Sequence, residues 1–92
     1  MRQYSFKLND DIREFADEVV EHLIRLFGVS ETEAVGRVNR QWKGLDMTNN
    51  STHPGHDGPP EHWAKRIYYV DSVSTRDWEQ NPTHPFPAKP YP

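Results

Sequence analysis

The sequence predicts a mainly α fold: a compact bundle of about three helices, with a short extended N-terminal segment and a proline-rich C-terminal tail. Apolar residues recur with the 3.6-residue period of an amphipathic helix in three parts of the chain. Capping signals precede these stretches, and five of the eight prolines fall in the last eleven residues. Residues 1–81 are therefore expected to form a single helical domain, on which the tail, residues 82–92, packs.

The stretch "YSFKL" near the N-terminus is predicted to be extended. Tyr4, Phe6 and Leu8 alternate with polar residues, which is the period of a strand with one covered face. The stretch is too short to form a stable sheet alone. We therefore expect a short strand or an arm laid across the helices.

The first helix is expected over residues 12–27. Its apolar stripe consists of Ile12, Phe15, Ala16, Val19, Leu23 and Leu26. Asp11 and Glu14 have the spacing of a capping box at its start. Gly28 favours the left-handed conformation in which many helices end.

A second helix is expected to begin at Ser30, which has capping-box spacing to Glu33. Its apolar stripe consists of Ala34, Val35, Val38 and Trp42. Gly36 lies inside this helix, where glycine costs roughly 1 kcal/mol relative to alanine. Close packing against the first helix is the expected reason for it, and Gly44 is predicted to end the helix.

Residues 46–60 are predicted to be a loop, because Asn, Ser, Thr, Gly and Pro dominate them. A third helix is expected to begin at the two prolines that end this loop. Trp63, Ile67 and Val70 have the spacing of one helical face. The stretch "IYYV", residues 67–70, also has high strand propensity, so its pairing with "YSFKL" is an alternative.

The apolar faces of these helices predict a common core. Its expected members are Phe15, Val19, Leu23, Val38, Trp42, Trp63 and Ile67. A short turn or helix with Ser74 or Thr75 as its cap is expected to carry Trp78.

The stretch "HPGHDGPPEH", residues 53–62, places three histidines and two carboxylates within ten residues. Imidazole and carboxylate groups bind zinc and related metals, so a metal site is one interpretation. Its candidate ligands are His53, His56, Asp57 and His62. No metal-binding motif with this spacing is known to us, however, and a polar loop in which Asp57 caps the third helix explains the same residues.

Residues 30–43 have the outline of the second helix of a helix-turn-helix, which suggests a DNA-binding regulator. The side chains that would contact phosphates or bases are Arg37, Asn39, Arg40 and Lys43. Against this interpretation, Glu31 and Glu33 would lie at the helix end that enters the major groove. The net charge of -3 also disfavours nucleic acid as a partner.

The composition excludes several classes of function. The chain has no cysteine, so disulfides, thiol nucleophiles and cysteine-based zinc sites are ruled out. No nucleophile-elbow or P-loop spacing is present, and we predict no enzymatic activity and no cofactor. The chain lacks the apolar run of a signal peptide or a membrane span, so a cytoplasmic location without a membrane partner is expected.

Elimination thus favours a small, non-enzymatic protein-interaction or regulatory module whose partner is another protein. The tail contains two P-x-x-P steps, which are typical of ligands for proline-recognising domains. The favoured alternative is intramolecular, with Phe86 and Tyr91 anchoring the tail on the domain.

The stretches "GVSETEAVGRVNRQWKG" and "EHWAKRIYYV" and the terminal "PYP" resemble a type of small bacterial protein of unassigned function. The resemblance covers about half of the chain. It implies a shared small helical fold and carries no activity, cofactor or site residue with it.

Overall fold

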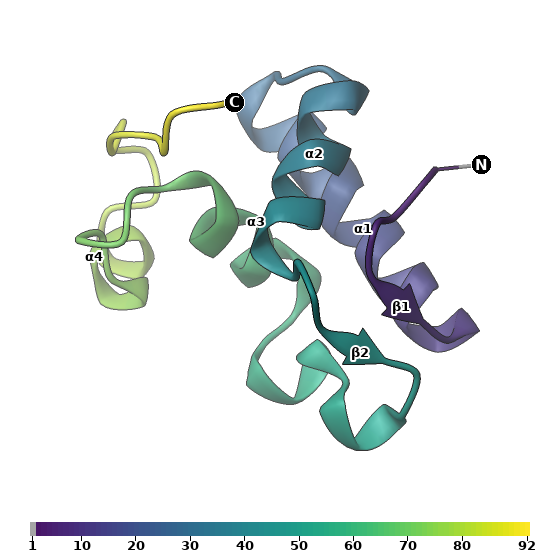
Figure 1. The fold of residues 1–92 in the computed structure, drawn as a ribbon. Coiled ribbons are helices and arrows are strands. Elements are labelled where there is room, and N and C mark those ends of the chain that lie inside the picture. The colour runs from purple at the N-terminus through teal and green to yellow at the C-terminus, as the bar shows by residue number, and fades with distance from the viewer. Residues whose placement is uncertain (1) are drawn as a thin grey trace.

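The computed structural model describes residues 2–92 and is mainly helical, as predicted (Figure 1). The α-helices are α1 (Asp10–Phe27), α2 (Glu31–Gln41), α3 (Pro60–Tyr68) and the short α4 (Thr75–Gln80). The other elements are strands β1 (Lys7–Leu8) and β2 (Asp46–Met47) and the 3-10 turns η1 (Asn50–Thr52) and η2 (Pro54–Asp57). The radius of gyration of 12.8 Å is close to the value of about 12 Å expected for a compact chain of this length.

Helix α1 begins at Asp10, two residues before the start of its apolar stripe. The prediction that Asp11 caps it is wrong: Asn9 is the cap, and its side-chain oxygen accepts a hydrogen bond from the backbone N–H of Ile12. The amide nitrogen of Asn9 donates to Thr48 O and Asn50 Oδ1. The cap is therefore chosen by contacts with a distant part of the chain as well as by the local sequence.

The connection between α1 and α2 follows the capping signals of the sequence. Gly28 has φ 66° and ends α1 in the left-handed region. Ser30 caps α2 by accepting from Glu33 N. Glu33 does not return a side-chain hydrogen bond to the cap, because its carboxylate pairs with Arg37.

The core lies where α1 packs against α3 and α2 (Figure 1). Its buried members include Phe6, Ile12, Phe15, Val19, Leu23, Val38, Trp42 and Ile67. Trp63 was expected to be buried with them but is only half-buried at the edge of this core. It packs edge-on against Trp42 at 5.3 Å between ring centroids, and its indole N–H donates to Pro54 O.

The segment 46–60 is more ordered than the predicted loop. It begins with β2, which pairs in parallel with β1 in the register Lys7 with Asp46 and Leu8 with Met47. The "IYYV" stretch does not pair with the N-terminal segment: α3 continues through Tyr68.

Asp57 does not cap α3, contrary to the prediction. Pro59 occupies the cap position and makes no side-chain hydrogen bond, and the Asp57 carbonyl accepts from Arg66. A proline in the first turn of a helix has no backbone N–H that needs a hydrogen-bond partner. Pro60 therefore leaves α3 with one fewer donor for a capping side chain to satisfy. Ser74 does cap α4, in a reciprocal capping box with Asp77.

The tail returns from α4 across α3 toward α2 (Figure 1). Tyr69 and Ala88 form an antiparallel bridge, flanked by hydrogen bonds from Val70 N to Pro87 O (3.0 Å) and from Lys89 N to Tyr68 O (2.8 Å). These bonds take up backbone groups beyond the end of α3.

Gly36 makes room on α2 for the side chain of Tyr91. A Cβ built on Gly36 would collide with the side chain of Tyr91. The close approach predicted for this glycine therefore exists, but its partner is the tail and not the first helix.

Candidate functional site

The histidine stretch 53–62 does not gather its side chains around one point. The Nδ1 atom of His53 accepts from Gly55 N, and its ring packs edge-on against Phe15 at 5.1 Å between centroids. His56 Nε2 lies 3.0 Å from the Asn50 carbonyl oxygen. One ring nitrogen of each histidine is thus hydrogen-bonded to a backbone group of the same loop.

His62 lies apart from these two, against Trp78 at 4.9 Å between ring centroids. Within residues 2–92, no group of three or more His, Asp or Glu side chains is placed to hold a metal ion. His53 and His62 are half-buried against aromatic rings. Ring packing therefore explains the positions of these two histidines.

The proposed DNA-contacting side chains of α2 also have intramolecular partners. Arg37 is 4% exposed. It donates to Glu33 Oε2 at 2.9 Å and to the Lys89 carbonyl at 3.0 Å. Its guanidinium also lies over the Tyr68 and Tyr91 rings. A side chain buried in this way is not presented to a phosphate or a base.

Asn39 and Arg40 hold the two ends of the chain on α2. Asn39 Oδ1 accepts from Ser5 N at 2.9 Å, and Arg40 donates to the Pro90 carbonyl at 2.9 Å. Lys43 is exposed. Of the four predicted DNA contacts, three are therefore engaged in holding the N-terminal segment and the tail.

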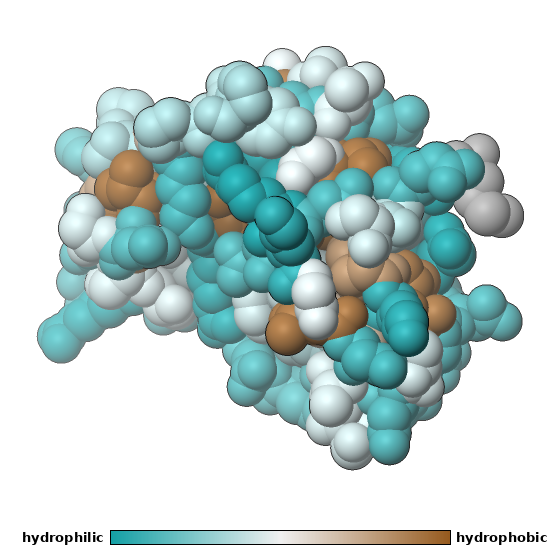
Figure 2. Space-filling view, viewed as in Figure 1, coloured by the Kyte–Doolittle hydropathy of each residue, from teal (hydrophilic) through white to brown (hydrophobic). Residues whose placement is uncertain are grey.

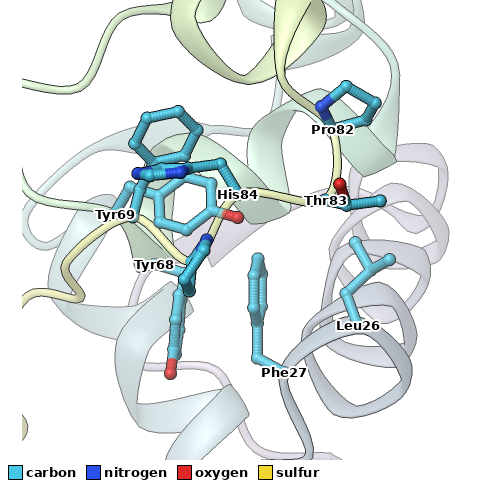
Figure 3. Close-up of a pocket in the computed structure, with 9 residues that line it drawn as sticks. Leu26, Phe27, Tyr68, Tyr69, Pro82, Thr83 and His84 are labelled. Atoms are coloured by element: carbon cyan, nitrogen blue, oxygen red, sulfur yellow. The ribbon is translucent and has the colours of Figure 1, made fainter.

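An aromatic groove lies instead between the C-terminal end of α1, the end of α3 and the first half of the tail (Figure 3). It has a volume of about 370 Å³ and is open to solvent along one side. Its lining consists of Leu26, Phe27, Tyr68, Tyr69, Pro82, Thr83, His84, Pro85 and Phe86.

The wall of this groove is a chain of ring contacts. Phe27 stacks on Tyr68 with 3.8 Å between centroids and meets Tyr69 edge-on at 5.3 Å. Tyr69 in turn meets Phe86 edge-on at 5.6 Å, and Phe86 meets His84 at 4.4 Å. Edge-on ring pairs stabilise one another, and together with the stacked pair they make the wall a continuous surface formed by three separate segments.

Figure 3 shows Phe27 between Tyr68 on one side and Leu26 and Thr83 on the other. Leu26 was expected to lie on the buried stripe of the first helix, yet it is 41% exposed. Pro82 and Thr83 of the tail line the groove together with Leu26 but leave that fraction of the leucine side chain uncovered. The groove therefore has an apolar lip that faces solvent.

Burial raises the pKa of the Tyr69 hydroxyl, and the neighbouring Tyr68 hydroxyl raises it further. Tyr69 therefore remains neutral at physiological pH and keeps a proton that it can donate. The groove combines ring surfaces with polar groups at its rim, where Thr83 and His84 are exposed.

No pattern in the sequence predicts this groove. Phe27 is the last residue of the first helix, and Phe86 was expected to anchor the tail. The proline-rich stretch brings the two together, but neither propensity nor periodicity determines where such a stretch lies. The only local sign is a dense set of aromatic residues in the second half of the chain.

Comparison of the chain with models of known protein families, with curated protein sequences and with solved structures finds no significant match. Among the helices of the described chain, none combines the length and the apolar character needed to cross a bilayer.

Proposed function

We propose that this protein is a small, non-enzymatic interaction module and that the aromatic groove receives a large apolar side chain of a partner protein. The observation that carries the proposal is the solvent-facing lip: Leu26 is 41% exposed directly beside the ring pair of Phe27 and Tyr68. Protein interfaces are anchored by aromatic and aliphatic side chains that fill such pockets.

The setting of the groove supports a protein partner over a small ligand. Pockets for small molecules enclose most of the ligand surface, whereas this groove is open along one side. Its apolar centre with an exposed polar rim at Thr83 and His84 follows the arrangement of protein interfaces.

A second hollow of about 370 Å³ has three charged side chains in its lining: Arg66, Asp71 and Lys89. Figure 2 shows a mostly hydrophilic face on which apolar atoms form small, separate patches. Single exposed apolar residues are normal for soluble domains. Leu45, for example, is 49% exposed but borders a different, smaller hollow of about 260 Å³, formed with Ser5, Phe6 and Lys7.

This second leucine supplies a matched control for the experiment. Peptides are selected on the purified full-length chain from a displayed random library, and their affinities are measured by calorimetry for Leu26→Lys and Leu45→Lys. A lysine in the last turn of α1 is favourable to the helix dipole, so Leu26→Lys should leave the fold intact.

We expect selected peptides to carry an aromatic or branched aliphatic anchor and to lose at least about tenfold in affinity on Leu26→Lys, because a charge then borders the anchor. Leu45→Lys should leave the affinity unchanged. Equal losses in the two variants, or selection of peptides without an apolar anchor, would contradict the proposal.

A further inference from the structure

The second half of the tail fills a separate site on the opposite side of Tyr68. Residues 87–91 lie extended beside the end of α3, held by the backbone hydrogen bonds of Tyr68 and Val70. Adding a strand-like segment in this way is a common mode of peptide recognition, because the backbone bonds give affinity without regard to side chains.

Two arginines of α2 contact this segment from its other side. Arg37 donates to the Lys89 carbonyl at 3.0 Å, and Arg40 donates to the Pro90 carbonyl at 2.9 Å. The same guanidinium groups lie over the ring of Tyr91, at 5.3 and 5.5 Å from its centroid. The tyrosine is therefore held by two cation–π contacts while the preceding carbonyls are held by charged donors.

Three further contacts make the site selective for side chains. The Tyr91 side chain enters the space left by the missing Cβ of Gly36. The Nζ atom of Lys89 donates to the Arg66 carbonyl at 3.1 Å and pairs with Asp71 at 3.2 Å. The lysine and tyrosine side chains each meet a matching feature of the domain, whereas Pro90 between them is held through its carbonyl by Arg40.

The chain's own tail leaves one group of this site unused. The Nη1 atom of Arg37 is buried and has no hydrogen-bond partner, although the side chain as a whole is 4% exposed. A buried donor without an acceptor is unfavourable, so a ligand that brings an additional oxygen to Nη1 would bind more tightly than the tail does.

We propose that this socket, formed by Gly36, Arg37, Arg40 and Tyr68, is a peptide-binding site for a partner protein that presents an extended Lys-Pro-Tyr segment. Residues 87–91 occupy the socket in cis and compete with that partner. This proposal does not depend on the aromatic groove, because the two sites lie on different faces of Tyr68 and are lined by different halves of the tail.

The covalent link between the tail and the domain determines how strongly residues 87–91 compete with a partner peptide. A segment joined to its site through a short linker has an effective concentration on the order of millimolar. Residues 82–85, which precede the docked segment, are exposed, and none of residues 82–92 belongs to the buried core cluster, so release of the tail should leave that core intact. A trans ligand is therefore expected to bind the intact chain weakly and to bind a chain with a weakened tail more tightly.

The test uses the full-length chain with Tyr91→Ala and a fluorescent synthetic peptide with the sequence of residues 82–92. We expect one peptide to bind per chain, at least about tenfold more tightly than it binds the wild-type chain. In NMR spectra, the amide of Val70 should shift on binding. A peptide with alanine in place of its tyrosine serves as the control and should not bind.

Gly36→Ala in the same Tyr91→Ala chain tests the socket itself. Alanine favours the helix, so this variant should fold at least as well as its parent, and it should lose the peptide because the added Cβ occupies the tyrosine site. Failure of Tyr91→Ala to bind the peptide, or equal binding with and without Gly36→Ala, would overturn the proposal. Wild-type chains that exchange tails and form dimers would do the same, since a second copy would then be the occupant.

Discussion

The two ends of this chain are both extended segments that lie on α2, yet they are attached by different forces. The N-terminal arm, residues 2–8, inserts Phe6 into the core, where the ring is 6% exposed and meets Trp42 edge-on at 5.6 Å. The tail keeps its last ring at the surface: Tyr91 is 37% exposed and is held by arginines.

The difference predicts that the arm is the more strongly held of the two ends. Burial of an aromatic ring contributes several kcal/mol to stability, and removing the arm would open the core to water. The tail is held by charge-assisted hydrogen bonds and cation–π contacts near the surface, each of which contributes less and is open to competition from water.

Truncating one phenylalanine in each segment compares how much the two ends contribute to stability. The loss in the arm should be the largest of all the effects predicted for this protein. Phe6→Ala removes a core side chain and should destabilise the domain by about 3–5 kcal/mol, enough to unfold much of it. Phe86→Ala removes a half-buried ring and should cost about 1 kcal/mol. Urea unfolding measures both, and a Phe86→Ala cost equal to that of Phe6→Ala would show that the tail belongs to the core.

Arg37→Leu should loosen the tail and leave the N-terminal arm unchanged. The variant removes the donor to the Lys89 carbonyl and the cation under Tyr91, at an expected cost of about 2 kcal/mol. Backbone order parameters of residues 87–91 should fall below about 0.6 while those of residues 4–8 remain unchanged. Arg40→Leu, at an exposed position, is the control and should have a smaller effect; an unchanged tail in Arg37→Leu would contradict the assigned role.

Tyr4→Phe should test the polar anchor of the arm. The Tyr4 hydroxyl donates to Asp17 Oδ1 at 2.6 Å, and its loss should cost about 1 kcal/mol. Burial raises the pKa of Tyr4 well above its ordinary value, and the bond to Asp17 raises it further. The unfolded chain releases this proton from about pH 10 upward while the folded chain retains it, so stability should fall with rising pH in that range.

Tyr4→Phe also serves as the control for the predicted pH dependence of stability. Tyr4→Phe should show a shallower loss of stability above about pH 10 than the wild type, because one of the groups that titrate differently in the two states is gone. Thermal unfolding followed by circular dichroism at several pH values measures the slope. Identical slopes would show that Tyr4 ionises equally in the folded and unfolded states.

The smallest effect is expected from a chelator, which tests the histidine stretch 53–62. A chelator should leave the melting temperature unchanged, and His53→Ala combined with His56→Ala should cost only about 1 kcal/mol through the lost contacts with Gly55 and Phe15. Elemental analysis of untagged protein is the second measurement. Stoichiometric zinc that disappears with the double substitution would establish a metal site and reverse this interpretation.

The helices were the most predictable part of this protein. The stripe of the first helix apart from Leu26, the left-handed Gly28 and the cap at Ser30 are where the sequence placed them. Each depends on residues within a few positions of one another, so the relevant contacts can be counted along the chain.

The wrong predictions concern contacts between distant positions. Asp11 has good capping spacing, but Asn9 is preferred because it also bonds to the segment around Asn50. Arg37 was expected to face solvent on a polar helix side, yet the tail covers it and Lys89 supplies an acceptor. A charged residue at a polar position of the helical period gives no indication of which remote segment will bury it.

By itself, the sequence determined the mainly helical class, the two capping sites around Gly28 and most of the core, because apolar period and cap chemistry are local properties. Only the tertiary structure decided that residues 87–91 lie on α2, that Gly36 receives Tyr91 and that Phe27 and Phe86 line one groove. A proline-rich segment has no internal hydrogen bonds and no periodic face to bury, so its position depends on the surface that it meets.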